Sequence, residues 1–170
     1  MTARARARYH GAMSRLDGGV IEPVGADLVA LAQAHALDAT VFPHSSLPPV
    51  FGGAGVAPVV WIARAEPGGP VVGFVGTRAR DGALEISGIA VEPAHQRAGI
   101  GRALVRAALR SARLRGLEIV SLHVSTGNAV AIRLYTSEGF RKAERLAGFY
   151  SAKRFPDAGD AWLMLRDSRA

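Results

Sequence analysis

The stretch from residue 84 to residue 105 constrains the fold more than any other part of the sequence. Residues 84–91 are apolar and rich in β-formers, Glu92-Pro93 ends this run, and a segment with helical periodicity follows Gly101. The connection between them reads Gln96-Arg97-Ala98-Gly99-Ile100-Gly101. Glycines let the backbone come close to a ligand, and the unpaired amides of a helix's first turn favour an anion. A strand, a glycine-rich loop and a helix in this order therefore predict a site for the pyrophosphate of a nucleotide-like cofactor.

Two common glycine-rich phosphate motifs do not fit this segment. The P-loop needs a lysine followed by serine or threonine after its last glycine, whereas Gly101 is followed by Arg102-Ala103. A dinucleotide-binding fold needs glycines directly after the strand and a small residue at the position of Leu104. Here seven residues separate Val91 from Gly99. The predicted phosphate loop therefore belongs to neither class.

Patterning along the rest of the chain predicts an α/β fold. Runs of β-formers between turn signals predict a strand that carries Glu85 and further strands at residues 20–24, 59–63, 71–76, 119–124 and 161–165. Helical periodicity predicts a helix after the glycine-rich loop and two others, at residues 26–39 and 129–138. Strands and helices in this order form a mixed sheet with flanking helices.

Composition favours one compact domain. The chain has 170 residues, of which 49% are hydrophobic, enough to bury a sizeable core. Arginines crowd the start of the chain, and we expect a basic, flexible tail at 1–16 before a single domain at 17–170. Cysteine is absent, no apolar run approaches the roughly 20 residues of a membrane span, and no signal peptide opens the chain. We therefore expect a cytoplasmic protein without membrane contacts.

The net charge of +7 raises the question of a nucleic-acid partner. Beyond the tail, arginines recur at helical spacing after the glycine-rich loop, at Arg102, Arg106, Arg110 and Arg113. A solvated helix face opposite an apolar one gives the same pattern, and we favour it over a nucleic-acid surface. The five histidines show no metal-ligand spacing, so no metal is predicted.

The glycine-rich loop and a second block resemble the GNAT superfamily of N-acetyltransferases, whose pyrophosphate loop reads Gln/Arg-x-x-Gly-x-Gly/Ala. The second block contains Leu122-His123-Val124, Asn128, Ala131, Leu134-Tyr135 and Gly139-Phe140. The resemblance covers roughly residues 84–166. It implies acetyl-CoA as cosubstrate and a mostly antiparallel central sheet, splayed between the strands that hold Glu85 and His123.

The resemblance also implies where acetyl-CoA binds. The pyrophosphate would lie on the loop and the first helical turn, and the thioester carbonyl would meet backbone amides near residues 89–91, where strands of this family carry a β-bulge. The implied cofactor-binding residues are Ile89, Ala90, Val91, Gln96, Arg97, Ala98, Gly99, Ile100, Gly101, Arg102, Ala103, Asn128 and Tyr135.

Three side chains are candidates for proton transfer. The family places the hydroxyl at the position of Tyr135 beside the CoA sulfur as general acid. Glu85 and His123 are both candidates for the base that takes the amine's proton, and the sequence does not decide between them. His123 matches a position where N-terminal protein acetyltransferases carry glutamate or histidine. An imidazole with a reference pKa of about 6.5 is mostly neutral at pH 7.

Two further stretches are similar to the N-terminal protein acetyltransferases. Phe42-Pro43 matches a pair in their peptide-binding loop, and Tyr150 matches the second tyrosine of a pair at the peptide entrance, with Phe149 in place of the first. The favoured acceptor is therefore the α-amine of a protein or peptide, attacking acetyl-CoA directly in a ternary complex on a monomer or homodimer. The alternatives are a small-molecule amine, such as an aminoglycoside, polyamine or amino acid, and a non-catalytic acetyl-CoA-binding module.

Overall fold

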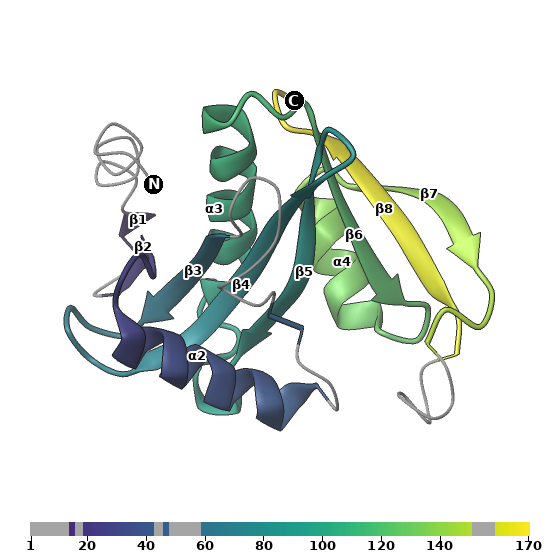
Figure 1. Ribbon diagram of the computed structural model, residues 1–170. Coiled ribbons are helices and arrows are strands. Elements are labelled where there is room, and N and C mark those ends of the chain that lie inside the picture. Colours follow the sequence, from purple (N-terminus) through teal and green to yellow (C-terminus); the bar gives the residue numbers. More distant parts are fainter. Residues whose placement is uncertain (1–13, 16–18, 43–45, 48–58, 151–158) are drawn as a thin grey trace.

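The computed structural model describes residues 14–15, 19–42, 46–47, 59–150 and 159–170. Within these ranges eight strands form one sheet, in the order β1-β2-β3-β4-β5-β6-β8-β7 (Figure 1). Neighbouring strands run antiparallel except β5 and β6, which are parallel. The predicted mixed, mostly antiparallel sheet is confirmed. The strands are β1 (Ser14–Arg15), β2 (Val20–Pro23), β3 (Val59–Arg64), β4 (Val71–Arg80), β5 (Ala83–Val91), β6 (Ile119–Ser125), β7 (Arg141–Leu146) and β8 (Ala161–Asp167).

Helices cover both faces of this sheet. They are α2 (Leu28–Val41), α3 (Ile100–Leu114) and α4 (Ala129–Ser137), with a short 3-10 turn, η1 (Pro93–His95), after β5. Helix α2 lies on one face, and α3 and α4 lie on the other (Figure 1). Asp27 caps α2 and Asn128 caps α4, each by accepting a hydrogen bond from the backbone amide three residues later.

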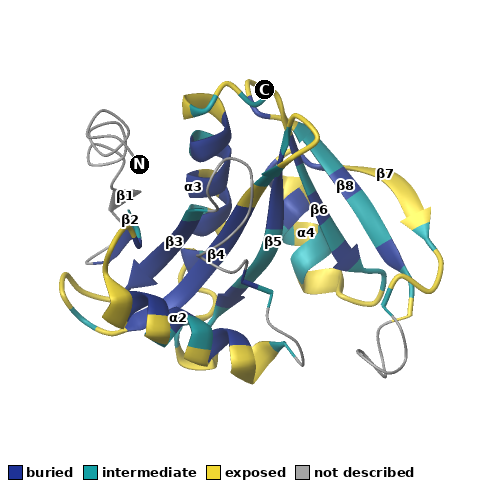
Figure 2. Cartoon of the chain, in the orientation of Figure 1, coloured by how far each residue is buried: buried dark blue, intermediate teal, exposed yellow. Residues whose placement is uncertain are grey.

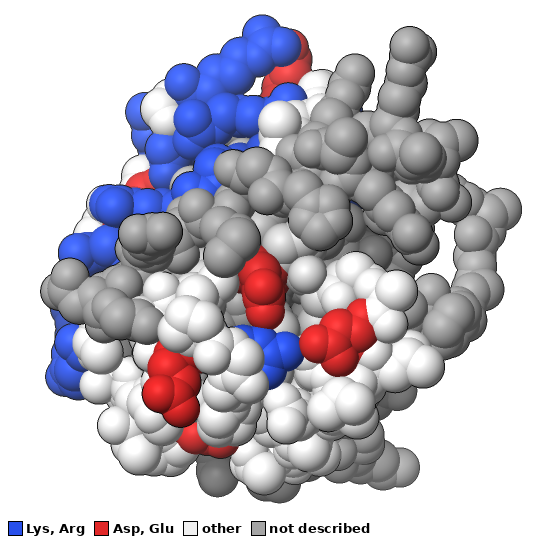
Figure 3. Space-filling view, turned by 90° about the vertical axis from the view of Figure 1, so that its left-hand side faces the viewer, with Lys and Arg blue, Asp and Glu red and all other residues white. Residues whose placement is uncertain are grey.

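The buried side chains form two clusters, one on each face of the sheet. Figure 2 shows the buried residues concentrated on the central strands and on α3. Side chains alternate along a strand, so Trp61 of β3 packs into the α3 side while its neighbour Ile62 packs into the α2 side. On α3 the apolar residues, such as Leu104 and Leu109, are buried. The exposed arginines of α3 lie on its opposite side, and Lys and Arg atoms gather along the left-hand edge of the face seen in Figure 3.

Strand β5 contains an extra residue and then leaves β6. Gly88 pairs with Gly76 and Ile86 with Thr77, so Ser87 is the unpaired residue of a β-bulge. Because of it, Ile86 and Ile89, three residues apart, both contact the α3-side core. The expected bulge therefore lies at Ser87, ahead of residues 89–91. Among the described strands, β6 pairs with Ala83–Ile86 of β5, and β4 pairs with the remainder of β5 beyond the bulge. The predicted splay is confirmed at this point.

Strand β7 is absent from the sequence-based prediction. Its residues, Arg-Lys-Ala-Glu-Arg-Leu, contain no apolar alternation, and the first five are exposed. It forms the edge of the sheet beside β8, where Lys142 Nζ lies 4.6 Å from the centre of the Trp162 ring. Backbone pairing with β8, rather than burial of its side chains, stabilises this strand.

Some predictions fall outside the described residues. They include the first 13 residues of the predicted tail and Pro43, whereas Ser14–Arg15 pair with β2. None of the helices found in the described ranges combines the length and the hydropathy that crossing a membrane requires.

Candidate active site

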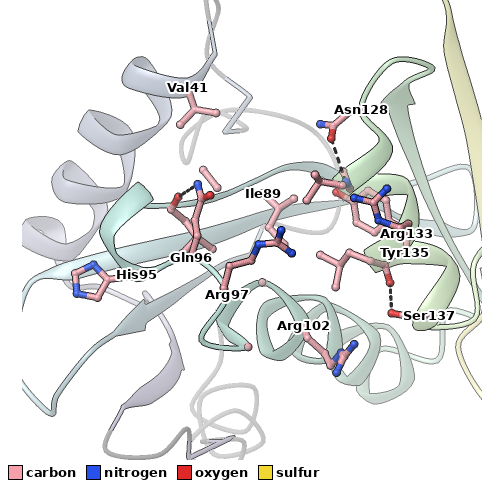
Figure 4. Close-up of a pocket in the computed structure, with 17 residues that line it drawn as sticks. Val41, Ile89, His95, Gln96, Arg97, Arg102, Asn128, Arg133, Tyr135 and Ser137 are labelled. Carbon is pink, nitrogen blue, oxygen red and sulfur yellow. Dashed lines mark hydrogen bonds between the residues drawn. The ribbon is translucent and has the colours of Figure 1, made fainter.

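A cavity of about 700 Å³ opens between the end of β5, the glycine-rich loop and α4. Figure 4 shows loop residues such as Gln96 and Arg97 on one side of it and α4 residues such as Arg133 on the other. Ten predicted cofactor residues line the cavity: Ile89, Ala90, Val91, Gln96, Arg97, Gly99, Gly101, Arg102, Asn128 and Tyr135. Ala98, Ile100 and Ala103 do not line it. Ile100 is buried and Ala103 packs against the core, because the first turn of α3 directs both toward the sheet.

The glycine-rich loop has the geometry of an anion cradle. Gly99, the N-cap of α3, has a left-handed φ of 81°, which a residue with a Cβ adopts only with strain. Gln96 closes the loop, because its Nε2 donates to the Val91 carbonyl at 3.1 Å. A Cβ at Gly101 would lie 3.5 Å from Leu134, on the cavity wall. Gly99 and Gly101 both line the cavity, so the first turn of α3, whose amides have no partner within the helix, begins at its wall.

Basic side chains surround this cradle. Arg97, Arg102 and Arg133 line the cavity, and all three are exposed. The carboxylate of Glu138, whose side chain is buried, accepts from Arg102 Nε at 3.0 Å and from Arg106 Nε at 2.9 Å. The cavity therefore combines positive charge with helix-terminal amides, which is the composition that a pyrophosphate requires.

Tyr135 lies in the last turn of α4 and is buried, with 5% of its surface exposed. It stands seven residues after the N-cap Asn128, about two helical turns along the same side. Its ring packs edge-on against Phe140 with centroids 5.8 Å apart. Burial, and secondarily the neighbouring Tyr150, raises the pKa of the Tyr135 phenol well above its ordinary value. At neutral pH the hydroxyl is a proton donor.

Glu85 lies on the other face of the sheet, where it is held by a hairpin partner. It pairs with Arg78 across β4 and β5, and its buried carboxylate accepts from Arg78 Nε at 3.0 Å and Nη2 at 2.9 Å. The same contact raises the pKa of the Arg78 guanidinium. Both carboxylate oxygens of Glu85 are thus already engaged by a permanent cation.

His123 shares this face with Glu85. Parallel pairing places Glu85 beside Ser121, and His123 follows two residues later on the same side of β6. Its ring stacks on Phe149 at 4.4 Å between centroids and 16° between planes. Burial lowers the pKa of His123, and Arg78 and Arg80 lower it further, whereas Glu85 opposes the change. The imidazole is therefore neutral at pH 7 and can accept a proton.

Phe149 connects the histidine to Tyr150. It stacks on His123 and meets the Tyr150 ring edge-on, with 5.0 Å between the ring centroids. Tyr150 is half-buried, and burial raises its pKa. Tyr135 and His123 lie on opposite faces of the sheet, because Tyr135 packs in the α3-side core and His123 alternates along β6 with Leu122 and Val124 of that core.

Phe42, one of the predicted acceptor-binding residues, lies near the cavity but not in its lining. Phe42 ends α2 and packs against the α2-side core, and it does not line the cavity, although its neighbour Val41 does. Several functional candidates were not predicted. Arg78 could have been found, because the turn Asp81-Gly82 sets Arg78 opposite Glu85. The stacking of Phe149 on His123 has no local sequence signal, since 26 positions separate them.

These features define a class: an α/β protein whose splayed sheet carries a cavity between the end of β5, the glycine-rich loop and α4. Residues 30–140 match the acetyltransferase (GNAT) family, and the chain belongs to this family.

Among its relatives, the N-alpha-acetyltransferase RimI of Mycobacterium tuberculosis is 37% identical over 108 residues, which are 61% of this chain and 64% of that protein. A mycothiol acetyltransferase of Thermobispora bispora is 40% identical over 85 residues, 46% of this chain and 29% of the relative. The chain thus spans less than two thirds of these two relatives. The structure of Arabidopsis thaliana NAA60 in complex with acetyl-CoA is similar in fold, with a TM-score of 0.70, 22% identity and coverage of 89% of this chain and 99% of that one.

Proposed function

We propose that the protein transfers an acetyl group from acetyl-CoA to the N-terminal α-amine of a protein or peptide. The observation that carries the proposal is the arrangement at the splay: one cavity leads from the anion cradle at Gly99 to the buried phenol of Tyr135, and the neutral imidazole of His123 lies across the sheet. The similarity to a relative named N-alpha-acetyltransferase supports the choice of acceptor.

The cradle residues would hold acetyl-CoA through its phosphates. The amides of the first turn of α3 and the side chains of Arg97, Arg102 and Arg133 supply the positive potential. Among the described residues, the part of β5 beyond Ser87 has no strand partner on its β6 side, so the backbone amides that point to that side are the proposed donors to the thioester carbonyl oxygen. When bound, acetyl-CoA supplies an activated thioester.

His123 is the proposed base, and Glu85 is not. The carboxylate of Glu85 is occupied by the two hydrogen bonds from Arg78, so a proton would have to displace an existing ion pair. His123 is neutral and lies on the same face. It takes the proton of the attacking amine, directly or through water, as the N–C bond forms. Arg78 helps by balancing the charge of Glu85, which would otherwise favour the imidazolium form.

Tyr135 is the proposed acid. As the C–S bond breaks, the phenol gives its proton to the sulfur, so that the leaving group departs as a neutral thiol. A buried phenol with a raised pKa keeps its proton until a stronger base appears beside it. His123 gains one proton from the amine and Tyr135 loses one proton to the sulfur, so the net number of protons on the protein does not change during the transfer.

The pKa of an α-amine acceptor is low enough for a weak base such as His123 to suffice. An α-amine has a reference pKa of about 7.7–8.0, so an appreciable fraction is already neutral at physiological pH, whereas a lysine at about 10.4 is almost fully charged. An imidazole whose pKa is lowered suits the first acceptor better than the second. A small-molecule acceptor is the second candidate, favoured by the 40% identity to a mycothiol acetyltransferase over 85 residues.

The test is CoA release from acetyl-CoA with three groups of acceptors: short peptides with free N-termini, N-terminally blocked peptides that contain lysine, and small amines. Turnover confined to the free N-termini is expected. Turnover with small amines alone would select the second candidate, and tight acetyl-CoA binding without turnover on any acceptor would select the non-catalytic module.

A further inference from the structure

The β-bulge of β5 carries a buried hydroxyl group that lacks a hydrogen-bond partner among the described residues. It belongs to Ser87, the extra residue that the bulge inserts opposite β4. Buried polar groups are nearly always paired in folded proteins, because an unpaired one has lost its water without gaining another partner. The Ser87 hydroxyl is therefore able to bond with a polar group that the described chain does not supply.

Ser87 lies on the same side of the sheet as His123. Parallel pairing of β5 with β6 ends at Ile86 and Leu122. Ser87 and His123 occupy the next position along the two strands, where these separate (Figure 1). Leu122 contacts the α3-side core, so strand alternation directs His123 to the other face. Ile86 and Ile89 contact the same core, and Ser87 of the bulge between them is directed to the other face as well.

An attacking amine needs such a hydroxyl. A neutral primary amine has one lone pair, which attacks the thioester carbonyl, and two N–H groups, of which His123 takes one proton in the proposed function. The other N–H needs an acceptor that holds the amine with its lone pair toward the carbonyl. Glu85 shares this face, but both of its oxygens already accept from Arg78. The Ser87 oxygen has two acceptor positions and no described partner, so it meets the requirement.

We propose that the Ser87 hydroxyl accepts a hydrogen bond from the second N–H of the acceptor amine and so orients the amine for attack. This role rests on the proposed function, since it concerns the amine that His123 deprotonates. Ser87 exchanges no proton in the step. The N–C bond forms, one amine proton passes to His123, and the N–H held by Ser87 stays on the nitrogen of the amide product.

The number of N–H groups on the acceptor tests this role. A peptide whose first residue is N-methylated has one N–H in its neutral form, and His123 takes that proton, so none remains for Ser87. Ser87→Ala is expected to lower kcat/KM for the unmethylated peptide about tenfold, the equivalent of one hydrogen bond. The same substitution is expected to leave kcat/KM for the N-methylated peptide unchanged. The preference for the primary amine should therefore fall about tenfold in the variant.

The matched control is Ser121→Ala. Ser121 pairs with Glu85 in the closed part of the sheet and lies on the same face as His123, two residues before it. This variant is expected to leave kcat/KM for both peptides unchanged. In Ser87→Ala, Tm is expected to stay at the wild-type value or to rise, because the substitution removes a buried hydroxyl without a described partner. The acetyl-CoA Kd, measured by calorimetry, should also stay unchanged.

A peptide that lacks the α-amino group gives a second comparison, which does not depend on turnover of the N-methylated peptide. It offers no N–H to Ser87 or His123 and acts as a competitive inhibitor against the unmethylated peptide. Its inhibition constant is expected to be the same in wild type and in Ser87→Ala. An inhibition constant that rises as much as kcat/KM falls would show that Ser87 acts on the rest of the peptide, and the proposed role would be wrong.

The outcomes separate this role from the proposed function. Equal losses of kcat/KM for the two peptides in Ser87→Ala would overturn the role, because a group that acts on the thioester or on the fold does not distinguish one N–H from two. An unchanged kcat/KM for the unmethylated peptide would overturn it as well. If wild type acetylates no peptide, the proposed function fails, and the assignment of Ser87 to a peptide amine fails with it.

Discussion

Replacement of Tyr135 by phenylalanine separates its chemical role from its packing. The ring, which meets Phe140 at 5.8 Å, keeps its place, and only the hydroxyl is lost. The free energy of unfolding should therefore change by less than about 1 kcal/mol, or roughly 2–4 °C in Tm for a chain of this size. Because only 5% of the residue is exposed, water cannot easily replace the missing donor. The loss of a general acid should lower kcat by about 10²–10⁴-fold.

The assay is steady-state CoA release with a peptide acceptor, accompanied by thermal unfolding and by acetyl-CoA titration. The expected result for Tyr135→Phe is a large fall in kcat with nearly unchanged Tm and acetyl-CoA Kd. A kcat within about threefold of wild type would refute the reasoning, because a general acid contributes far more than that. A loss of Tm as large as the loss of activity would mean that Tyr135 acts through packing.

Three other perturbations test the base, the cradle and the fold. Glu85→Gln removes the negative charge that opposes the lowering of the His123 pKa, so the acidic limb of the kcat/KM profile should move to lower pH while activity at pH 7 is retained. His123→Gln should abolish that limb and most of the activity. Loss of activity at all pH values in Glu85→Gln alone would make Glu85 the base. Gly99→Ala places a Cβ on a φ of 81°, a strain of roughly 1–2 kcal/mol that the loop relieves by leaving its present conformation, so acetyl-CoA binding should weaken about tenfold. The control Gly116→Ala has similar strain at a φ of 69° away from the cavity and should affect only stability, and equal affinities in the two variants would contradict the cradle. Arg64→Met breaks a buried cluster in which Arg64 meets Glu22 at 2.9 Å and Asp27 at 3.1 Å. It should cost about 2 kcal/mol, less than a fully buried pair because both partners are partly exposed, and should lower Tm by roughly 4–8 °C without changing kcat, whereas an unchanged Tm would show that the cluster contributes nothing.

The glycine-rich loop and the helices that line the cavity could be predicted because their signals are local. The loop has a left-handed residue at the start of a helix, and the sequence shows it as Gly99 followed by a helical pattern. The same holds for α4, where Asn128 as N-cap fixes Tyr135 two turns later. Helix and strand boundaries of this part follow from turn residues and periodicity, and they agree with the structure to within a few residues.

The surroundings of His123 and the end of α2 depend on contacts between distant parts of the chain. Nothing near His123 in the sequence indicates that Phe149 stacks on it, and nothing near Asp38 indicates that its carboxyl group serves Ser46. Strand β7 is not predicted for the same reason, because its exposed residues carry no apolar pattern and its strand partner in the described sheet, β8, is distant in the sequence. Arg78 is the exception, since a two-residue turn at Asp81-Gly82 fixes its partner Glu85 by simple counting.

The most direct test of the account is to find which nitrogen of one peptide receives the acetyl group. A peptide with a free N-terminus and an internal lysine is incubated with the protein and acetyl-CoA, and the product is sequenced by fragmentation mass spectrometry. The account predicts acetylation of the first residue alone, because a neutral imidazole at His123 suits an α-amine. Acetylation of the lysine instead, or no acetylated peptide while small amines react, would contradict it.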